Sequence, residues 1–266
     1  MYDWAQTPFE WHEELFMYAA EIGITIISTP FDETAVDLLE SLNCPFYKVA
    51  SFEFTDIPLI KYIAKTKKPI ILSTGMANED EINETLKVVK NYGCGDFILL
   101  HCVSGYPTPV SQINLKTIEL MKDKFDCEVG LSDHTLGNTS AILSISFGAK
   151  LIEKHFTYRR SDGGPDAEFS MEPNELKDLS HNLSVAYQAI GEGSFKMKAA
   201  EESNIKFRRS IYAIKKINKG DIFCDSNIKR IRPGYGLEPK YFEEIIGKTA
   251  TRDIEEASPI KLSDFT

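Results

Sequence analysis

The sequence has few cysteines, and none lies close to another. Its five cysteines form no C-x-x-C pair, so we expect neither a disulfide framework nor a zinc cluster. Scattered single cysteines are typical of a reducing compartment, and we expect a cytoplasmic protein. The chain also lacks an apolar run of roughly 18 residues, and its first residues do not resemble a signal peptide. We therefore expect neither export nor insertion into a membrane.

Positive charge is also scarce. The 266 residues include 30 Lys and Arg against 40 Asp and Glu, a formal net charge of −10. This excess of negative charge argues against a general nucleic-acid surface, although a single cationic pocket could still bind a small anion. Hydrophobic residues make up 42% of the chain, which is enough for a sizeable core. We expect a small molecule as the partner and no nucleic acid.

Short β-rich runs alternate with helical patterns in the first part of the chain. This alternation predicts a parallel sheet, either open and doubly wound or closed into a (β/α)8 barrel. Polar residues follow every run, which favours the barrel, because a barrel builds its active site from all of its loops. Six expected strands leave two βα units of a closed barrel unaccounted for. The expected strands are Ile24–Ser28, Phe46–Ser51, Ile70–Ser73, Phe97–Cys102, Glu128–Ser132 and Ala149–Glu153.

The chain is expected to open on a helix and to end in a second domain. Thr7-Pro-Phe-Glu10 has the pattern of an N-cap, a first-position proline and a capping-box glutamate. Residues 191–207 are polar and unpatterned, which is typical of a linker. Residues 208–266 contain short β-rich runs and turns, so we expect a small β-rich domain after a barrel domain in residues 1–190.

Two histidines stand at the C-terminal ends of neighbouring expected strands. His134 ends the motif Val129-Gly-Leu-Ser-Asp-His, and His155 ends Leu151-Ile-Glu-Lys-His. Neutral imidazole is the commonest protein metal ligand and titrates near neutrality. The pair therefore predicts adjacent metal ligands or acid/base groups, with two hydrogen-bonded structural histidines as the alternative.

Hydroxyl side chains and one lysine follow the other strands. Lys48 lies within an apolar run, where its charge needs an anion. A phosphate or carboxylate needs several donors and a cation, whereas the same Ser and Thr residues could merely cap the following helices. The candidate anion-binding residues are Thr29, Lys48, Ser51, Ser73 and Ser132.

Two carboxylates are further candidates. Glu53 could be an acid/base group or accept a sugar hydroxyl, or it could be a surface residue of its loop. Asp166 follows Gly163-Gly-Pro, and turn chemistry alone explains that pattern well. Cys102 lies in an apolar run, so we expect it to be a packing residue rather than a nucleophile.

Taken together, these motifs resemble the sialic acid synthase family, which condenses phosphoenolpyruvate with N-acetylated hexoses. The resemblance spans essentially the whole chain, and Thr7-Pro-Phe-Glu-Trp-His12 and Ala50-Ser-Phe-Glu53 are most similar to the pseudaminic acid synthase branch. The motifs that carry it are Ser28-Thr-Pro-Phe-Asp, Tyr47-Lys-Val-Ala-Ser, Lys68-Pro-Ile-Ile-Leu-Ser-Thr-Gly-Met, Leu131-Ser-Asp-His-Thr-Leu-Gly, Glu153-Lys-His-Phe-Thr, Gly164-Pro-Asp and Arg232-Pro-Gly.

The resemblance implies a fold, a cofactor and an assembly. The fold is a TIM-type (β/α)8 barrel followed by a small β-rich antifreeze-like (SAF) domain. The cofactor is a divalent ion, Mn²⁺ or Mg²⁺, which His134 and His155 hold and which polarises the sugar aldehyde. The assembly is a homodimer in which the SAF domain of one subunit reaches over the partner's active site.

The resemblance also implies a role for each matched residue. The catalytic group is Glu53, His134, His155 and Asp166. Thr29, Lys48, Ser51, Ser73 and Ser132 bind phosphoenolpyruvate, while Glu53, Tyr106 and Asp166 contact the sugar and Arg232 arrives from the other subunit. Ser104 stands where many family members have asparagine, which fits a different sugar.

The implied reaction makes pseudaminic acid from 2,4-diacetamido-2,4,6-trideoxy-altrose, with N-acetylneuraminate or legionaminate as alternative products. The family's first two strands have no counterpart before Met1, so we expect an N-terminally truncated form of a longer enzyme. An inactive remnant that pairs with full-length subunits and a metal-dependent aldolase that uses free pyruvate are the other hypotheses.

Overall fold

The computed structural model describes residues 6–93 and 95–266, which form two compact units. The units are Met1–Gly191 and Glu192–Thr266, and each has a hydrophobic core of its own. The first residues, where no signal peptide is expected, and Cys94 lie outside the described residues.

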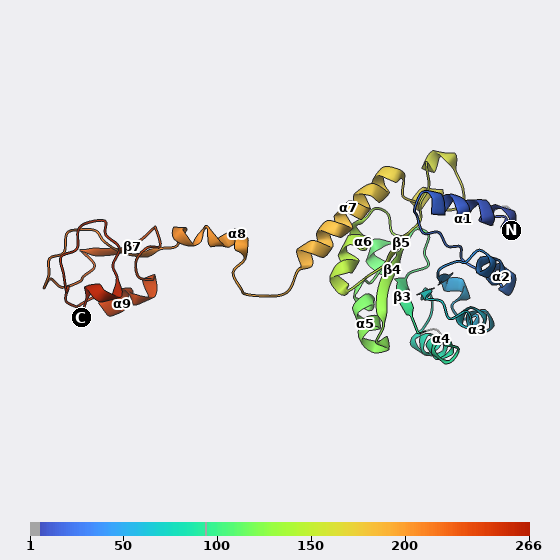
Figure 1. Ribbon diagram of the computed structural model, residues 1–266, viewed down its shortest axis with the longest axis horizontal. Helices are drawn as coiled ribbons and strands as arrows, with labels where there is room; N and C mark the ends of the chain where they lie inside the picture. Colours follow the sequence, from blue (N-terminus) through green and yellow to red (C-terminus); the bar gives the residue numbers. More distant parts are fainter. Residues whose placement is uncertain (1–5, 94) are drawn as a thin grey trace. The chain divides into compact units, whose positions relative to one another are not determined.

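The first unit is built on a parallel sheet with the strand order β1-β2-β3-β4-β5 (Figure 1). Each strand pairs with the next one along the chain, as in a barrel wall, so the sheet forms a half-barrel of the TIM type. The strands are β1 (Tyr47–Val49), β2 (Ile70–Ser73), β3 (Phe97–Cys102), β4 (Glu128–Asp133) and β5 (Ile152–Lys154).

The expected strand at Ile24–Ser28 is wrong. Among the described residues no ladder joins this segment to β1, and the sheet has five strands rather than six. The amide of Ile24 instead donates to the carbonyl of Ala19 (2.9 Å), which ends the preceding helix. The run has the β-branched composition of a strand, but a strand also needs a partner for its backbone groups.

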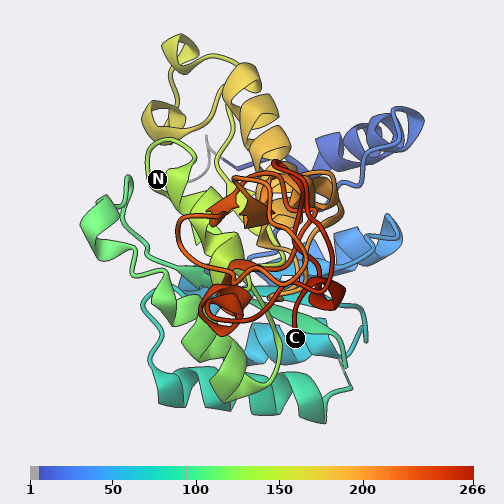
Figure 2. The same cartoon turned by 90° about the vertical axis from the view of Figure 1, so that its left-hand side faces the viewer.

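Successive side chains of each strand point to opposite faces of the sheet. Tyr47, Val49 and Leu72 are completely buried in the core between the sheet and its helices. The helices lie along the outer side of the strands (Figure 1 and Figure 2). The intervening residues, such as Lys48 and Ser73, therefore face the inner side of the half-barrel.

The helices of this unit follow the expected βα order. The expected capping box at Thr7 is wrong, because the first helical turn is the 3₁₀ segment Phe9–Trp11, with Pro8 in the N-cap position and no side-chain cap. The helices are α1 (His12–Glu21), α2 (Glu33–Ser41), α3 (Ile57–Ala64), α4 (Glu79–Asn91), α5 (Lys116–Phe125), α6 (Thr139–Ser144) and α7 (Pro173–Ile190). No helix in the described part of the chain is long and apolar enough to cross a membrane.

The second unit contains short β elements around a small core. Strands β6 (Ser210–Ala213) and β7 (Ile228–Ile231) pair antiparallel, and isolated bridges extend this pairing. The helices are α8 (Ala199–Glu202) and α9 (Phe242–Ile245). Helix α8 lies within residues 191–207, where the sequence pattern predicts a linker.

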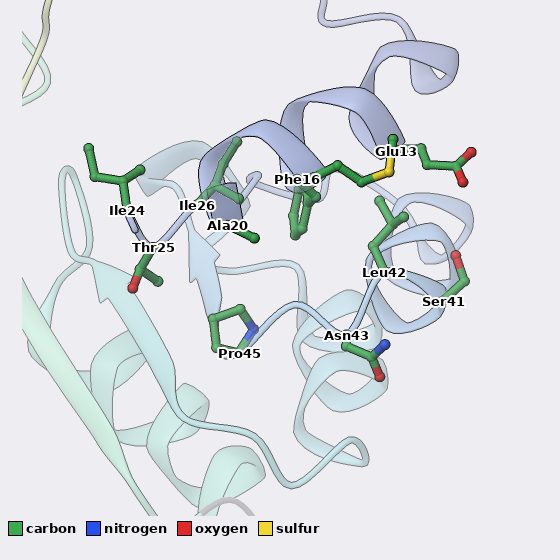
Figure 3. Close-up of a pocket in the computed structure, with 11 residues that line it drawn as sticks. Glu13, Phe16, Ala20, Ile24, Thr25, Ile26, Ser41, Leu42, Asn43 and Pro45 are labelled. Carbon is green, nitrogen blue, oxygen red and sulfur yellow. The ribbon is translucent and has the colours of Figure 1, made fainter. Parts of the chain in front are cut away.

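A groove of about 510 Å³ lies between α1, residues 24–26 and the end of α2 (Figure 3). Phe16, Ala20 and Leu42 line it, and its wall is largely apolar. Asn43 and Pro45 also line the groove and precede β1, so it lies at the end where the strands begin. Because βα barrels place their chemistry at the opposite end, we do not assign the active site to this groove.

His101 on β3 faces away from the inner side of the sheet and is 7% exposed. Its Nε2–H donates to the carbonyl of Ile113 at 2.6 Å. Burial of the ring lowers the pKa of His101, because a buried imidazolium loses its hydration.

We expect the free energy of unfolding to decrease as the pH falls below the unfolded-state histidine pKa near 6.5. The unfolded chain binds a proton that the folded His101 resists, so stability is lost at up to about 1.4 kcal/mol per pH unit. His101→Gln keeps a donor for Ile113 and removes the titration. Urea denaturation at about pH 7 and about pH 5 should show a smaller decrease for this variant.

His181→Gln is the matched control, because His181 is an exposed residue of α7. It should retain the pH dependence of the unchanged protein. An equally steep decrease in His101→Gln would contradict the role assigned to His101.

Candidate functional site

Lys48 brings a cation into the inner side of the half-barrel, near the ends of the strands. The residue is 5% exposed, and its Nζ lies 3.5 Å from Glu153 Oε2. Glu153 Oε1 accepts a hydrogen bond from Ser132 Oγ at 2.7 Å. Burial lowers the pKa of Lys48, and the charge of Glu153 opposes this shift. The three residues form one network across β1, β4 and β5.

Two serines and a glycine lie beside this network. Ser51 Oγ accepts from the amide of Gly75 (3.1 Å) and donates to Cys102 Sγ (3.3 Å). A Cβ on Gly75 would lie 2.7 Å from Ser51 Oγ and would also clash with Ser104 Oγ. Glycine thus leaves open a small space between the hydroxyls of Ser51 and Ser104.

Two buried polar atoms in this region have no hydrogen-bond partner within the described residues. They are Ser73 Oγ and Glu53 Oε2, and Ser73 is only 2% exposed. Burial raises the pKa of Glu53, and the positive charge of Lys48 lowers it by a smaller amount. Buried polar groups are almost always paired, so these atoms are suited to a bound ligand. The hydroxyl of Ser73, together with the cation of Lys48, suits an anion, whereas the carboxylate of Glu53 suits a hydroxyl group that donates to it.

The rings of His134 and His155 lie beside one another, with their centroids 5.1 Å apart. His134 Nδ1–H donates to the carbonyl of Val103 at 3.1 Å, and His155 Nδ1 lies 3.4 Å from Asp166 Oδ2. These contacts leave Nε2 as the lone-pair nitrogen of each ring when both are neutral.

The two rings have opposite pKa shifts. Burial disfavours the charged form of His134, but contacts with Cys102 and Val103 more than offset it and raise its pKa. Burial and the neighbouring His134 lower the pKa of His155. His155 is therefore the more readily neutral ring, and a neutral ring is what metal binding needs.

Two neighbouring imidazoles fit part of a divalent metal site. In residues 6–93 and 95–266, no three His, Cys, Asp or Glu side chains converge to hold an ion. Waters or substrate oxygens would therefore have to complete the coordination. Mn²⁺ and Mg²⁺ accept such oxygen ligands readily.

Aromatic side chains surround the two histidines. The Tyr106 ring lies 4.4 Å from that of His134 and 6.1 Å from that of His155, between centroids. Phe169 lies 4.9 Å from His155. The site thus has an apolar wall on the histidine side and hydroxyls and charge on the Lys48 side.

Of the residues of the first unit singled out in the sequence, all but Thr29 meet in this region. Thr29 lies in the segment before α2, and no hydrogen bond or ion pair joins it to the others in the described part of the chain. Arg232 follows β7 in the second unit and is exposed. The residues that the first unit brings together are Lys48, Ser51, Glu53, Ser73, Ser104, Tyr106, Ser132, His134, His155 and Asp166.

Sequence reasoning missed three residues of the site. Glu153 is two residues before His155, and residues two apart on a strand share a face, so this spacing could have identified it. The importance of Gly75 and Phe169 depends on residues distant in the sequence. Cys102, expected to be a packing residue, also contacts the site, with its Sγ 3.9 Å from His134 Nδ1.

Comparison with known proteins matches the two units to two families. The NeuB family model matches residues 1–195, and the SAF domain model matches residues 208–266. The chain is 40% identical to a pseudaminic acid synthase of Campylobacter jejuni (strain 81-176), over 100% of this chain and 77% of that protein. It is 42% identical to an N,N'-diacetyllegionaminic acid synthase of C. jejuni (strain NCTC 11168), over 94% and 76% of the two chains.

A solved structure supports the same fold. It is that of the N-acetylneuraminic acid synthetase of Leptospira borgpetersenii, with a TM-score of 0.72 and 32% identity. The similarity covers 77% of this chain and 71% of that one. All three of these relatives are synthases of acidic sugars.

Gly75→Ala should weaken the binding of inorganic phosphate at least about tenfold, because the added methyl group fills the space between Ser51 and Ser104. Isothermal titration calorimetry with phosphate measures this change. Gly95→Ala is the control, because its Cβ would meet open space. Equal phosphate affinity in both variants would show that anions do not bind beside Gly75.

Proposed function

The chain belongs to the NeuB family, and we propose that it condenses phosphoenolpyruvate with an open-chain N-acetylated hexose. The products are a nonulosonic acid and phosphate. The observation that carries the proposal is the buried Lys48, with the unpaired hydroxyl of Ser73, on the same inner side of the half-barrel as His134 and His155. One side of this site suits a doubly charged anion, and the other suits a carbonyl group.

Lys48 and the serines bind phosphoenolpyruvate in this proposal. The Lys48 Nζ contacts Glu153 at 3.5 Å, a separation that leaves its charge available to a stronger anion. Ser73, whose hydroxyl has no partner in the described residues, donates a hydrogen bond to the phosphate or carboxylate oxygens. Ser51 and Ser132 donate to these oxygens as well once their hydroxyl hydrogens turn from Cys102 Sγ and Glu153 Oε1 to the ligand.

His134 and His155 would hold a divalent ion, Mn²⁺ or Mg²⁺, through Nε2, and this ion would act as a Lewis acid toward the sugar aldehyde. Asp166 orients the ring of His155 through Nδ1. Tyr106 and Asp166 line the position of the sugar, next to the two rings.

The reaction forms one carbon–carbon bond and breaks one carbon–oxygen bond. The methylene carbon of phosphoenolpyruvate attacks the aldehyde carbon, and the aldehyde oxygen takes up a proton. Water adds to the resulting cationic carbon and loses a proton, which leaves a hydroxyl group on that carbon. Phosphate then leaves with cleavage of its C–O bond and takes up the proton of this hydroxyl group as the keto group forms. We assign to Glu53 the supply of the proton to the aldehyde oxygen, and burial raises the pKa of this carboxyl, which favours its protonated form.

The sugar is the finer part of the proposal. The identities of 40% and 42% to synthases of two different products lie too close together to separate them. We assign 2,4-diacetamido-2,4,6-trideoxy-altrose, with pseudaminic acid as the product. Ser104, which lies beside Gly75, supports a sugar that differs from that of family members with asparagine at this position.

Incubation with phosphoenolpyruvate, Mn²⁺ and this hexose should release phosphate and give pseudaminic acid, identified by mass spectrometry and NMR. N-acetylmannosamine and the 2,4-diacetamido-trideoxymannose precursor of legionaminic acid are the competing substrates. A faster reaction with either one would change the sugar assigned here. No phosphate release with any of the three would contradict the proposed condensation.

Lys48→Met supplies the negative control for this assay. It should raise the KM for phosphoenolpyruvate roughly 30-fold or more, because a charge-assisted bond contributes about 2 kcal/mol or more. Lys65→Met removes an exposed lysine after α3 and should react like the unchanged chain.

We also propose that the enzyme is a homodimer in which Arg232 serves the active site of the partner. His134→Ala and Arg232→Ala should each be inactive alone. When the two variants are coexpressed, the mixture should have about a quarter of the activity of the unchanged enzyme. Half of the dimers then contain one subunit of each variant, and one of the two active sites in such a dimer is intact. If Arg232 acted within its own subunit, the mixture would stay inactive.

A further inference from the structure

Asp133 and Lys154 are the charged residues of the two histidine motifs that the proposed function does not use. Each directly precedes one histidine, His134 or His155. Lys154 Nζ lies 3.1 Å from Asp133 Oδ2, and the side chains are 3% and 0% exposed. Because side chains alternate along a strand, this pair lies on the face of the sheet opposite the candidate site.

The ammonium group of Lys154 has a partner for each of its three hydrogens. Besides Asp133, it donates to the carbonyls of Thr135 (2.6 Å) and Gly137 (3.1 Å). The other oxygen of Asp133 accepts from the amide of Thr135 at 2.9 Å. One end of β5 is therefore tied to the turn that directly follows His134.

Stability alone does not explain such a pair. Removing two charges from water is costly, and buried ion pairs are often no more stabilising than apolar residues of similar volume. A buried pair with all of its hydrogen bonds made can hold two segments in one relative position. Here it holds the end of β4 relative to the end of β5.

We propose that Asp133 and Lys154 are positioning residues that set the separation of His134 and His155 and thereby the affinity of the site for a divalent ion. This inference rests on the proposed metal site. Each histidine follows one member of the pair in the chain, so a shift of either strand end moves the ring of the histidine that follows it. Residues that orient metal ligands typically change metal affinity about 10- to 100-fold when they are replaced.

Binding of Co²⁺, followed by its visible absorption, tests the proposal without measuring catalysis. Asp133→Asn keeps an acceptor for Thr135 but removes the charge that holds Lys154. The double variant Asp133→Asn/Lys154→Met leaves no buried unpaired charge. Both should bind Co²⁺ about 10- to 100-fold more weakly than the unchanged chain, with an altered spectrum.

The double variant should remain folded, with circular dichroism like that of the unchanged chain. Glu79→Gln is the matched control, because it breaks an exposed ion pair with Lys124 that joins α4 to α5 and involves neither β4 nor β5. This control should bind Co²⁺ normally, and His134→Ala should bind it poorly.

Three results would overturn the inference, and they differ from one another. Co²⁺ affinity within about twofold of the unchanged chain in both folded variants would contradict the positioning role alone. A double variant that unfolds, together with a folded Asp133→Asn variant of normal Co²⁺ affinity, would show that the pair serves only the stability of the fold. Failure of the unchanged chain to bind Co²⁺ would refute the proposed metal site as well.

Discussion

The parallel pairing of β1 to β5 is the constraint on which the first unit depends. Because every strand runs in the same direction, all of their C-terminal ends meet at one edge of the sheet. Alternation along each strand then separates the side chains into two sets. Tyr47 and Val49 enter the outer core, whereas Lys48 between them faces inward. The same alternation places Ser132 and His134 on one side and Asp133 on the other.

Two lysine–carboxylate pairs use this arrangement in different ways. The pair of Lys48 with Glu153 is loose, at 3.5 Å, and the glutamate side chain is 39% exposed. Such a pair can exchange its partner for a bound anion. The pair of Lys154 with Asp133 is closed, because both side chains are buried and every ammonium hydrogen is used. The first suits binding, and the second suits the positioning of the residues next to it.

Much of the fold could be predicted because its signals are local. Apolar runs identify β2 and β3 at their observed positions. The prediction of a strand at Ile24–Ser28 is wrong. The segment has the composition of a strand, but its backbone pairs with no strand of the described sheet. The prediction of a capping box at Thr7 is also wrong, because the first helical residue is Phe9 and Pro8 takes the N-cap position expected for Thr7.

The sequence by itself determined which chemical groups stand at the ends of the strands. Residue type is a property of the chain, and so is the two-residue spacing that places side chains of a strand on the same face. It also placed His134 and His155 at neighbouring strand ends. Only the tertiary structure decided that Glu153 bridges Ser132 and Lys48, and that Gly75 opens a space between Ser51 and Ser104. The tie between Asp133 and Lys154 likewise joins residues that lie 21 positions apart. Such contacts depend on the register between strands, and that register is fixed by packing over the whole sheet rather than by any local pattern.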